Sequence, residues 1–379
     1  MLAASPQRTS PQRLRRKLHP LVVEAAALPG MDRYRKAFPA LAHLWILLLH
    51  VLEGSPSLRQ THARLRLRDR LWSAWGMTRF ISRPQLTRSS TSRPVDGPVH
   101  LWQTLVNQAY GRAVSDPALR ALLFHEAVDS TFIRLSAQLA PWAKHGKAAA
   151  GQCVQCGFDL ARGIPVWLAM HGREANDREA LRQRDLSGLA GWTVILDKGY
   201  YAHKRLAGLL AAGVDFITRR YEPARVDILE SWEVPLVPLR GGERVLSDHL
   251  IDLGSPNNRT STVVRGVRLI QYETPDGELH EVLTSRLDLT AGELIQLYRK
   301  RWRVPSGREL FFRFLKRQLG MIRPFGYSRE ALWLTVLIVA AVAVLLAMLE
   351  SLRPMSESRV AWAKVVATLL TETVDVLRL

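Results

Sequence analysis

The sequence of 379 residues contains only two cysteines, Cys153 and Cys156, in the stretch CVQC. Two cysteines are too few for a disulfide framework. A four-ligand zinc site would need two more ligands, and the nearby His145 and His171 lack the compact spacing of zinc ligands. The surrounding sequence also lacks a thioredoxin-like context, which a redox motif would require. We therefore expect reduced thiols in a cytoplasmic protein.

Negative charge is also scarce in this sequence. Asp and Glu together number 34, against 53 Lys and Arg, so the formal net charge is +19. This excess favours a polyanionic partner, most simply nucleic acid, because closely spaced phosphates bind many cations at once. A generic basic protein is the alternative that composition alone leaves open.

Long apolar runs are limited to one. Residues 331–349 form a run of 19 residues without charge, which is long enough to cross a membrane. Their Ala and Val content suits a helix buried in a protein core, and a membrane-anchored basic protein is the alternative. Residues 1–19 lack the apolar region of a secretory signal, so we expect a disordered basic arm there.

The N-terminal third of the chain is predicted to be helical. An apolar helix ends at Gly54, and a second helix, over residues 55–76, begins at a Ser cap and alternates Leu with Arg. Turn residues and more Arg follow. These segments predict either a helix-turn-helix that presents Arg to phosphates or an ordinary helical hairpin with a basic face. Residues 89–98 are predicted to be a linker.

From about residue 120 the pattern changes to strands that alternate with helices, which is typical of an α/β core. A second set of short strands follows, including a hairpin around Pro275, Asp276 and Gly277, and indicates an all-β insertion. Helix resumes after the N-cap Thr290. Strands are expected at 126–135, within 156–171 as a pair, at 192–197 and at 214–220, and helices at 177–184 and 202–213.

Three carboxylates lie where a catalytic site would need them. Asp129 lies within a predicted strand, and Asp197 lies at the carboxyl end of a buried strand, where α/β folds bind ligands. Glu309 is the single acid within residues 298–317, which are rich in Arg and Lys. Each also has an ordinary interpretation: the aspartates as turn formers, and Glu309 as part of a capping box that begins at Ser306.

Together, the three acids are consistent with a metal site. Mg²⁺ prefers oxygen ligands, and phosphodiester chemistry can use two such ions roughly 4 Å apart. The acids would hold the ions, and the surrounding Arg and Lys would hold DNA phosphates.

The chain resembles bacterial transposases of the DDE class, specifically the insertion-sequence-four family, over about residues 35–350. The matching stretches, in family order, are SLRQTHARL from Ser57, VDSTFIRL from Val128, HGREANDREAL from His171, ILDKGYYAHKRL from Ile195, FITRR from Phe216, LTSRLDLTAGELIQLYRKRW from Leu283 and ELFFRFLKRQLG from Glu309. The resemblance implies an RNase H-like mixed sheet flanked by helices, with an all-β insertion and an N-terminal helical domain. The expected segments are a basic arm (1–19), a helical DNA-binding domain (20–115), the first part of the catalytic core (116–220), the β insertion (221–292), the second part of the core (293–352) and a C-terminal helix (353–379).

The resemblance also implies the site residues. Asp129, Asp197 and Glu309 would be the catalytic metal ligands for two Mg²⁺ or Mn²⁺ ions. The family's signature Tyr, Arg and Lys, which hold transposon-end phosphates, fall on Tyr298, Arg301 and Lys316. Trp302 would either stack on a flipped base or pack in the core. The apolar run after Glu309 would be a helix that packs against the catalytic sheet.

The sequence departs from the family pattern at one point. Seven residues, 302–308, separate Arg301 from Glu309, where the family has three, so residues 305–308 are interpreted as an insertion. Four residues add about one helical turn, but Pro305 and Gly307 oppose a continuous helix. Either a kinked helix still delivers Glu309 to the site, or this copy has decayed.

The function implied by the resemblance is cut-and-paste transposition of an insertion sequence. Its partners would be the terminal inverted repeats and target DNA, gripped by the N-terminal helices. The protein would act as a homodimer on DNA, in the bacterial cytoplasm at the nucleoid and without a membrane. A DNA-binding relic that recognises the ends without cleaving them is the alternative.

Overall fold

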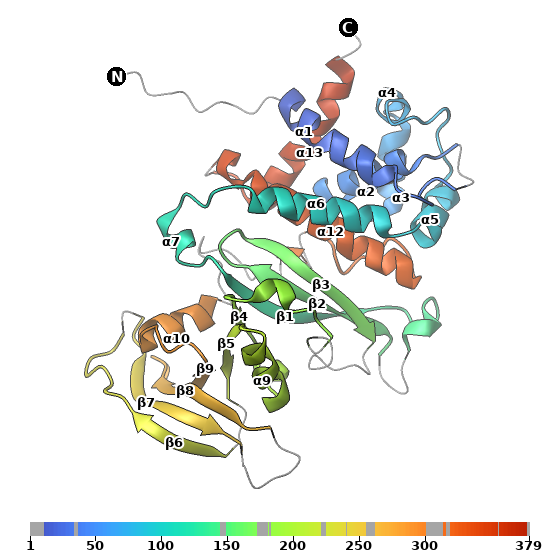
Figure 1. Ribbon diagram of the computed structural model, residues 1–379. Coiled ribbons are helices and arrows are strands. Elements are labelled where there is room, and N and C mark those ends of the chain that lie inside the picture. Colours follow the sequence, from blue (N-terminus) through green and yellow to red (C-terminus); the bar gives the residue numbers. More distant parts are fainter. Residues whose placement is uncertain are drawn as a thin grey trace, which may run out of the picture. The chain divides into compact units, whose positions relative to one another are not determined.

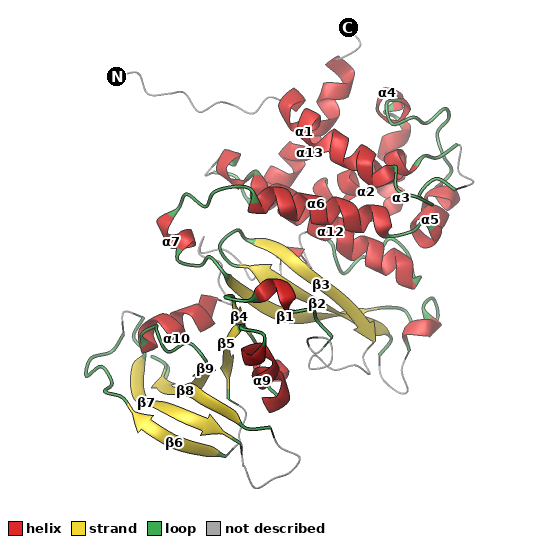
Figure 2. Ribbon diagram, viewed as in Figure 1, coloured by secondary structure: helices red, strands yellow, loops and turns green. Residues whose placement is uncertain are grey.

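The computed structural model describes residues 11–33, 37–144, 149–172, 181, 183–220, 225–239, 241–254, 262–300, 314–315, 319–354 and 356–376. The chain divides into two compact units. The helical unit comprises residues 1–113, 133–151 and 312–379, and the sheet unit comprises residues 114–132 and 152–311. Most of the helices belong to the first unit and most of the strands to the second (Figure 2).

Helix α12 is the core of the helical unit. It is apolar on all sides, is almost entirely buried, and packs against α2, α5 and α6 (Figure 1). The elements of this unit are α1 (Pro11–Ala26), α2 (Ala40–Leu52), α3 (Leu58–Arg66), α4 (Asp69–Ser73), α5 (Arg83–Ser92), α6 (Asp96–Tyr110), η1 (Pro141–Ala143), α12 (Arg329–Met348), η5 (Glu350–Leu352) and α13 (Arg359–Val376). The short helix α7 (Pro117–Arg120) begins the sheet unit.

The main contacts of α12 lie within the helical unit. The helix is long and apolar enough to cross a membrane, and 83% of its most apolar window is buried within the protein. The resemblance implied that it packs on the catalytic sheet as part of a segment 293–352. Its main contacts are with α2, α5 and α6 of the same unit, because a helix that is apolar all round needs partners on every side, and its packing against the catalytic sheet stays a prediction.

The boundary of the expected N-terminal arm is corrected. Helix α1 begins at Pro11, so the second half of the arm predicted at 1–19 is helical. Leu14, Leu18 and Val22 recur every four residues and are buried, whereas Arg16 and Lys17 are exposed. This spacing gives the helix one apolar face, which packs against α2, α6 and α13.

Two further predictions about the N-terminal helices are corrected. The helix predicted over residues 55–76 is divided into α3 and α4, which are separated by two exposed residues, Leu67 and Arg68. The predicted linker 89–98 is mostly the end of α5 and the start of α6. Buried Ser90 bonds its hydroxyl to Leu86 O and His43 Nε2, so this serine is accommodated inside a helix.

The sheet unit contains a nine-stranded sheet with the order β3-β2-β1-β4-β5-β9-β8-β7-β6. Strands β1, β4 and β5 are parallel, and β2 and β3 form an antiparallel pair. This is the predicted RNase H-like mixed sheet. The strands are β1 (His125–Arg134), β2 (Gly151–Asp159), β3 (Ile164–Gly172), β4 (Thr193–Ile195), β5 (Asp215–Arg219), β6 (Val226–Ser231), β7 (Arg244–Leu253), β8 (Val264–Glu273) and β9 (Leu279–Thr284).

The β insertion extends this sheet. Strand β9 pairs antiparallel with β5, and β8, β7 and β6 follow in antiparallel order. The predicted hairpin is β8–β9, with Gly277 at φ +80° in its turn. Helices α9 (His203–Ala211) and α10 (Ala291–Lys300) pack on this part of the sheet, and the short helices η2 (Ser187–Leu189) and η3 (Lys198–Tyr200) flank β4. The helix predicted at 177–184 lies largely outside the described residues.

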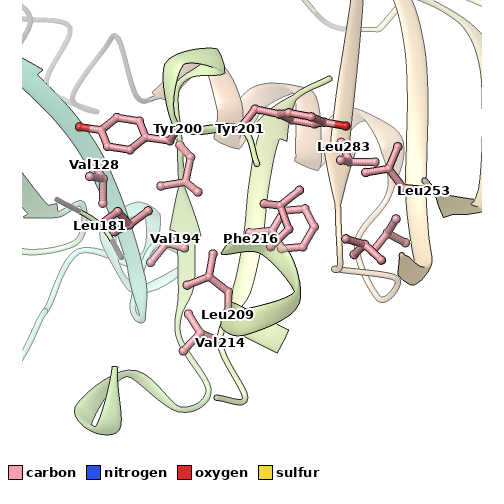
Figure 3. Close-up of a cluster of buried hydrophobic side chains, with 14 of the residues drawn as sticks. Val128, Leu181, Val194, Tyr200, Tyr201, Leu209, Val214, Phe216, Leu253 and Leu283 are labelled. Carbon is pink, nitrogen blue, oxygen red and sulfur yellow. The ribbon is translucent and has the colours of Figure 1, made fainter. Parts of the chain in front are cut away.

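One face of the sheet is covered by a large apolar cluster. Val128, Val194 and Phe216 point into it from β1, β4 and β5, and α9 contributes Leu209 (Figure 3). Leu196, just after β4, and Leu206 on α9 belong to the same cluster. Because strand side chains alternate between faces, the residues between these positions point to the opposite face.

A buried ion pair lies on the same face as the cluster. Glu126 on β1 is fully buried, and both of its oxygens accept hydrogen bonds from the Arg184 guanidinium, at 2.7 and 2.8 Å. Arg184 also lies over the ring of Trp167 on β3, 4.5 Å from its centroid. Gly157 on β2 leaves the space that the Glu126 carboxylate fills.

Replacing Gly157 with Ala should therefore destabilise the protein. The added Cβ would overlap Glu126 Oε1 and displace the buried pair, at a cost of about 2–4 kcal/mol. The matched control is Gly208→Ala in α9, where a Cβ meets open space and should stabilise the helix by up to about 1 kcal/mol. Urea unfolding measures both changes. Equal free energies of unfolding for Gly157→Ala and wild type would contradict the packing described here.

The helical unit contains a buried histidine with an altered pKa. His50 on α2 bonds Thr61 Oγ1 through Nδ1, at 2.7 Å. Burial, reinforced by the positive charge of Arg323, lowers the pKa of His50 from 6.5 to about 4. The unfolded chain therefore binds a proton at His50 at a higher pH than the folded chain does.

The stability contributed by neutral His50 should be complete above pH 6.5 and should be lost as the pH falls from 6.5 to about 4. The loss is about 3 kcal/mol. His50→Gln can still bond Thr61 but does not titrate, so its free energy of unfolding should fall less over this range. Urea unfolding of both proteins at about pH 7.5 and about pH 4.5 makes the comparison. Identical losses in the two proteins would exclude His50 as the cause.

Candidate active site

The two candidate aspartates lie on neighbouring parallel strands. The last residue pair of β1 and β4 is Ala127 with Ile195, an offset of 68 residues (195 − 127 = 68), and Asp129 and Asp197 are separated by the same number. The backbone stays extended at Asp197, with φ −75° and ψ 160°. Continuing the register by two residues therefore places Asp129 beside Asp197, since neighbouring strands are about 4.8 Å apart.

Both aspartates belong to the face opposite the apolar cluster. Val128 and Leu196, which precede them, point into the cluster, so Asp129 and Asp197 point to the other side of the sheet. Both side chains are half-buried. The sheet thus brings together two of the three predicted acids, Asp129 in the middle of β1 and Asp197 just past the carboxyl end of the neighbouring β4.

Backbone N–H groups hold both carboxylates. Asp129 Oδ1 accepts a hydrogen bond from Ser130 N at 2.8 Å, and Asp197 Oδ1 accepts one from Lys198 N at 2.7 Å. The second bond caps the short helix η3. These bonds restrict the orientation of each carboxylate, which a ligand set for a small cation requires.

The two tyrosines after Asp197 anchor this turn in opposite directions. Tyr200 is buried and donates its hydroxyl hydrogen bond to Gln155 on β2, whereas Tyr201 bonds His203 on α9 (Figure 3). Gln155 is itself 3.1 Å from His171 Nε2 on β3. Both tyrosines belong to the apolar cluster, so the chain after Asp197 is fixed to the face of the sheet that the cluster covers.

The cysteines take no part in a disulfide, in agreement with the prediction of free thiols. Burial raises the pKa of Cys156 well above its usual value, and the negative charges of Glu126 and Asp129 raise it further, against the effect of Arg184. Cys156 is therefore an unreactive buried thiol that lies near the candidate site. Cys153 is opposite His171 in the β2–β3 pair, a proximity that their sequence separation did not indicate.

Most of the predicted residues of the signature segment lie outside the described residues: Arg301, Trp302, Glu309 and Lys316. Tyr298 is described and is buried on α10, only 5% exposed. Among the residues that the structure describes, no group of three His, Cys, Asp or Glu could hold a metal ion. The donor set that is described consists of two carboxylates, the oxygen ligands that Mg²⁺ and Mn²⁺ accept.

Helices α3 to α5 carry a basic surface. Residues 57–92 contain a single acid, Asp69, and their arginines are exposed. The basic surface consists of Arg59, Arg64, Arg66, Arg68, Arg70, Arg79, Arg83 and Arg88. Arg64 and Arg68 pair with Glu53 at 3.4 and 3.2 Å. This surface is suited to phosphate contacts by its charge.

Sequence reasoning did not assign a role to Glu126, Arg184, Gln155 or Arg219. The first three support β1 and the turn after Asp197, and their sequence signals are only isolated polar residues in apolar surroundings. The signal for Arg219 was the stretch FITRR, whose first arginine ends strand β5 and whose second follows the strand.

The family model of the transposase DDE domain matches residues 125–345, more than half of the chain. The chain therefore belongs to this family: it is a DDE transposase, a polynucleotidyl transferase, as the sequence predicted. A solved structure of the piggyBac transposase synaptic complex with hairpin DNA is similar, with 12% sequence identity and a TM-score of 0.47, over 98% of this chain and 82% of that chain. Among curated proteins, none matches the sequence.

Proposed function

We propose that this transposase moves an insertion sequence by metal-dependent strand cleavage and strand transfer, in the cut-and-paste manner of the insertion-sequence-four family. The observation that carries the proposal is the shared register of Asp129, in the middle of β1, and Asp197, just past the carboxyl end of the parallel strand β4. Two oriented carboxylates on one face of an RNase H-like sheet match the chemistry of divalent-metal phosphoryl transfer.

In this proposal Asp129 and Asp197 hold Mg²⁺ or Mn²⁺, in a two-ion site, and Glu309 is the third ligand. Bound metal would stabilise the negative charge that develops on the phosphoryl oxygens. The protein's own contribution is to hold the carboxylates in place through Ser130 N and Lys198 N, and to keep the turn after Asp197 fixed through Tyr200.

The DNA partners would be the terminal inverted repeats and the target. The basic surface of α3 to α5 would bind the phosphates of the repeats, and Tyr298, Arg301, Trp302 and Lys316 would hold the transposon end beside the acids. We further propose a homodimer on DNA, located at the bacterial nucleoid in the cytoplasm and independent of a membrane.

The second candidate function is end recognition without cleavage. The observation that favours it is the four-residue insertion at 305–308, which introduces Pro305 and Gly307 ahead of Glu309. A decayed copy would bind its ends but fail to cut them.

Replacing Asp129 or Asp197 with Asn should abolish cleavage while DNA binding is retained. The loss should be roughly 100-fold or more, because a lost metal ligand removes several kcal/mol of transition-state stabilisation. The substrate is a plasmid that carries the coding sequence with its native flanking DNA, incubated with Mg²⁺. Nicks at the element's boundaries are mapped by primer extension.

The control is Asp276→Asn, an exposed turn residue of the β8–β9 hairpin, which should cleave like wild type. Cleavage by wild type with normal activity of Asp129→Asn and Asp197→Asn would exclude the proposed site. Boundary-specific binding with no cleavage by wild type would favour the decayed alternative.

A further inference from the structure

The register row that contains the two aspartates continues into β5. The last pair of β4 and β5 is Ile195 with Ile217, an offset of 22 residues (217 − 195 = 22), and Arg219 is 22 residues after Asp197. Arg219 is thus the residue opposite Asp197, as Asp197 is opposite Asp129. Side chains directly opposite in a parallel pair share a face, so all three lie on the same side of the sheet.

Spacing supports a shared site. Neighbouring strands are about 4.8 Å apart, so the row spans roughly 10 Å from Asp129 to Arg219. An arginine side chain is long enough to reach a phosphate group bound over its neighbouring strand. In this row the two acids come first and the arginine last. A phosphate bound over the row could therefore contact the arginine on one side and the metal held by the acids on the other.

The contacts of Arg219 differ from those of its neighbour on β5. Arg220 points to the opposite face and forms an ion pair with Glu281, with Arg220 NH2 3.0 Å from Glu281 Oε1. Within the part of the chain that the structure describes, Arg219 pairs with no carboxylate. Its NH2 group donates a hydrogen bond to His280 Nδ1 on β9, at 2.6 Å, and its side chain is half-buried.

His280 is placed to orient this guanidinium. Burial and the charge of Arg219 lower the pKa of His280, so its ring is neutral and Nδ1 can accept the hydrogen bond. The ring proton then lies on the other nitrogen, Nε2, which is 3.4 Å from Oε2 of the exposed Glu278. The ring of Tyr272 packs against His280 with centroids 5.5 Å apart. One nitrogen of Arg219 is thus held, and the guanidinium has further donors for a second partner.

We propose that Arg219 binds a phosphate of the DNA strand that Asp129 and Asp197 act on, and that His280, held by Glu278, is the positioning residue for its guanidinium. This inference rests on the proposed function. The ligand is a phosphodiester oxygen pair, which a guanidinium binds in bidentate fashion. His280 acts through Arg219 and does not itself contact DNA.

Arg219→Gln should lower the rate of boundary cleavage on the native-flank plasmid about 10-fold or more, because a charge-assisted contact to the reacting strand is lost. DNA binding without cleavage is measured in EDTA by the fluorescence anisotropy of a labelled fragment of the same DNA. The slope of log binding constant against log salt concentration should be smaller than that of wild type by about one ion. Arg219→Lys keeps the charge and should retain the salt dependence while cleaving more slowly than wild type. Arg225→Gln removes a cation that pairs with Asp227 on exposed β6 and should change neither measurement.

The positioning role of His280 is tested by comparing two substitutions of this residue. Asn can accept from Arg219 and donate to Glu278, so His280→Asn should cleave close to the wild-type rate, whereas His280→Leu should be several-fold slower. Equal rates for these two variants would overturn the role of His280. Melting temperatures of both variants identify any loss that comes from unfolding.

Three outcomes decide the rest. If Arg219→Gln and Arg225→Gln have the same cleavage rate and the same salt dependence of DNA binding, the proposed phosphate contact is overturned. The contact is also overturned if Arg219→Gln binds DNA with the wild-type salt dependence and its cleavage saturates at a lower Mg²⁺ concentration than that of wild type. Arg219 would then only balance the negative charge of the acids. If the wild-type protein does not cleave the DNA, the proposed function is rejected. A shallower salt dependence of DNA binding for Arg219→Gln than for wild type would still support the phosphate contact.

Discussion

The parallel register of β1, β4 and β5 is the constraint on which the rest of the sheet unit depends. Successive side chains alternate between faces, so a slip of one residue would turn Asp129 or Asp197 into the apolar cluster and expose Val128 or Leu196. Burying an unpaired carboxylate among aliphatic side chains is far more costly than any gain from the shifted strand. The cluster on one face therefore fixes the position of the acids on the other.

The sequence contained enough information to predict the existence of this site but not its geometry. An apolar run that ends in an acid predicted Asp197 at a strand end, and the alternating pattern around Asp129 predicted β1. The separation of 68 residues became meaningful only when the pairing of Ala127 with Ile195 was known. The same holds for Arg219, because pairing between strands depends on long-range packing and not on local pattern. The signature residues Arg301, Trp302, Glu309 and Lys316 remain predictions.

The helices were harder to predict than the strands, because the composition of two helical segments suggested disordered or linker sequence. Residues 11–19 are rich in Arg, which indicated a disordered arm, but Leu14 and Leu18 recur at helical spacing and are buried. Ser and Thr in residues 89–92 indicated a linker, but the capping box of Ser82 and Gln85 starts a helix that continues through them. The partners of α12 could not be predicted, since a helix without a polar face gives no direction for its packing.

The pair of Glu126 and Arg184 shows how a charge can support the site without taking part in chemistry. A buried ion pair adds little net stability, because the cost of removing two charges from water offsets much of their attraction. Its effect is geometric: the Glu126 carboxylate lies where a side chain at Gly157 would be, and its partner Arg184 lies over the ring of Trp167. Strands β1, β2 and β3 must therefore hold one relative position for the pair to form. Glu126 is three residues before Asp129 on the same strand, so the pair that fixes β1 among its neighbours also fixes the first acid of the site.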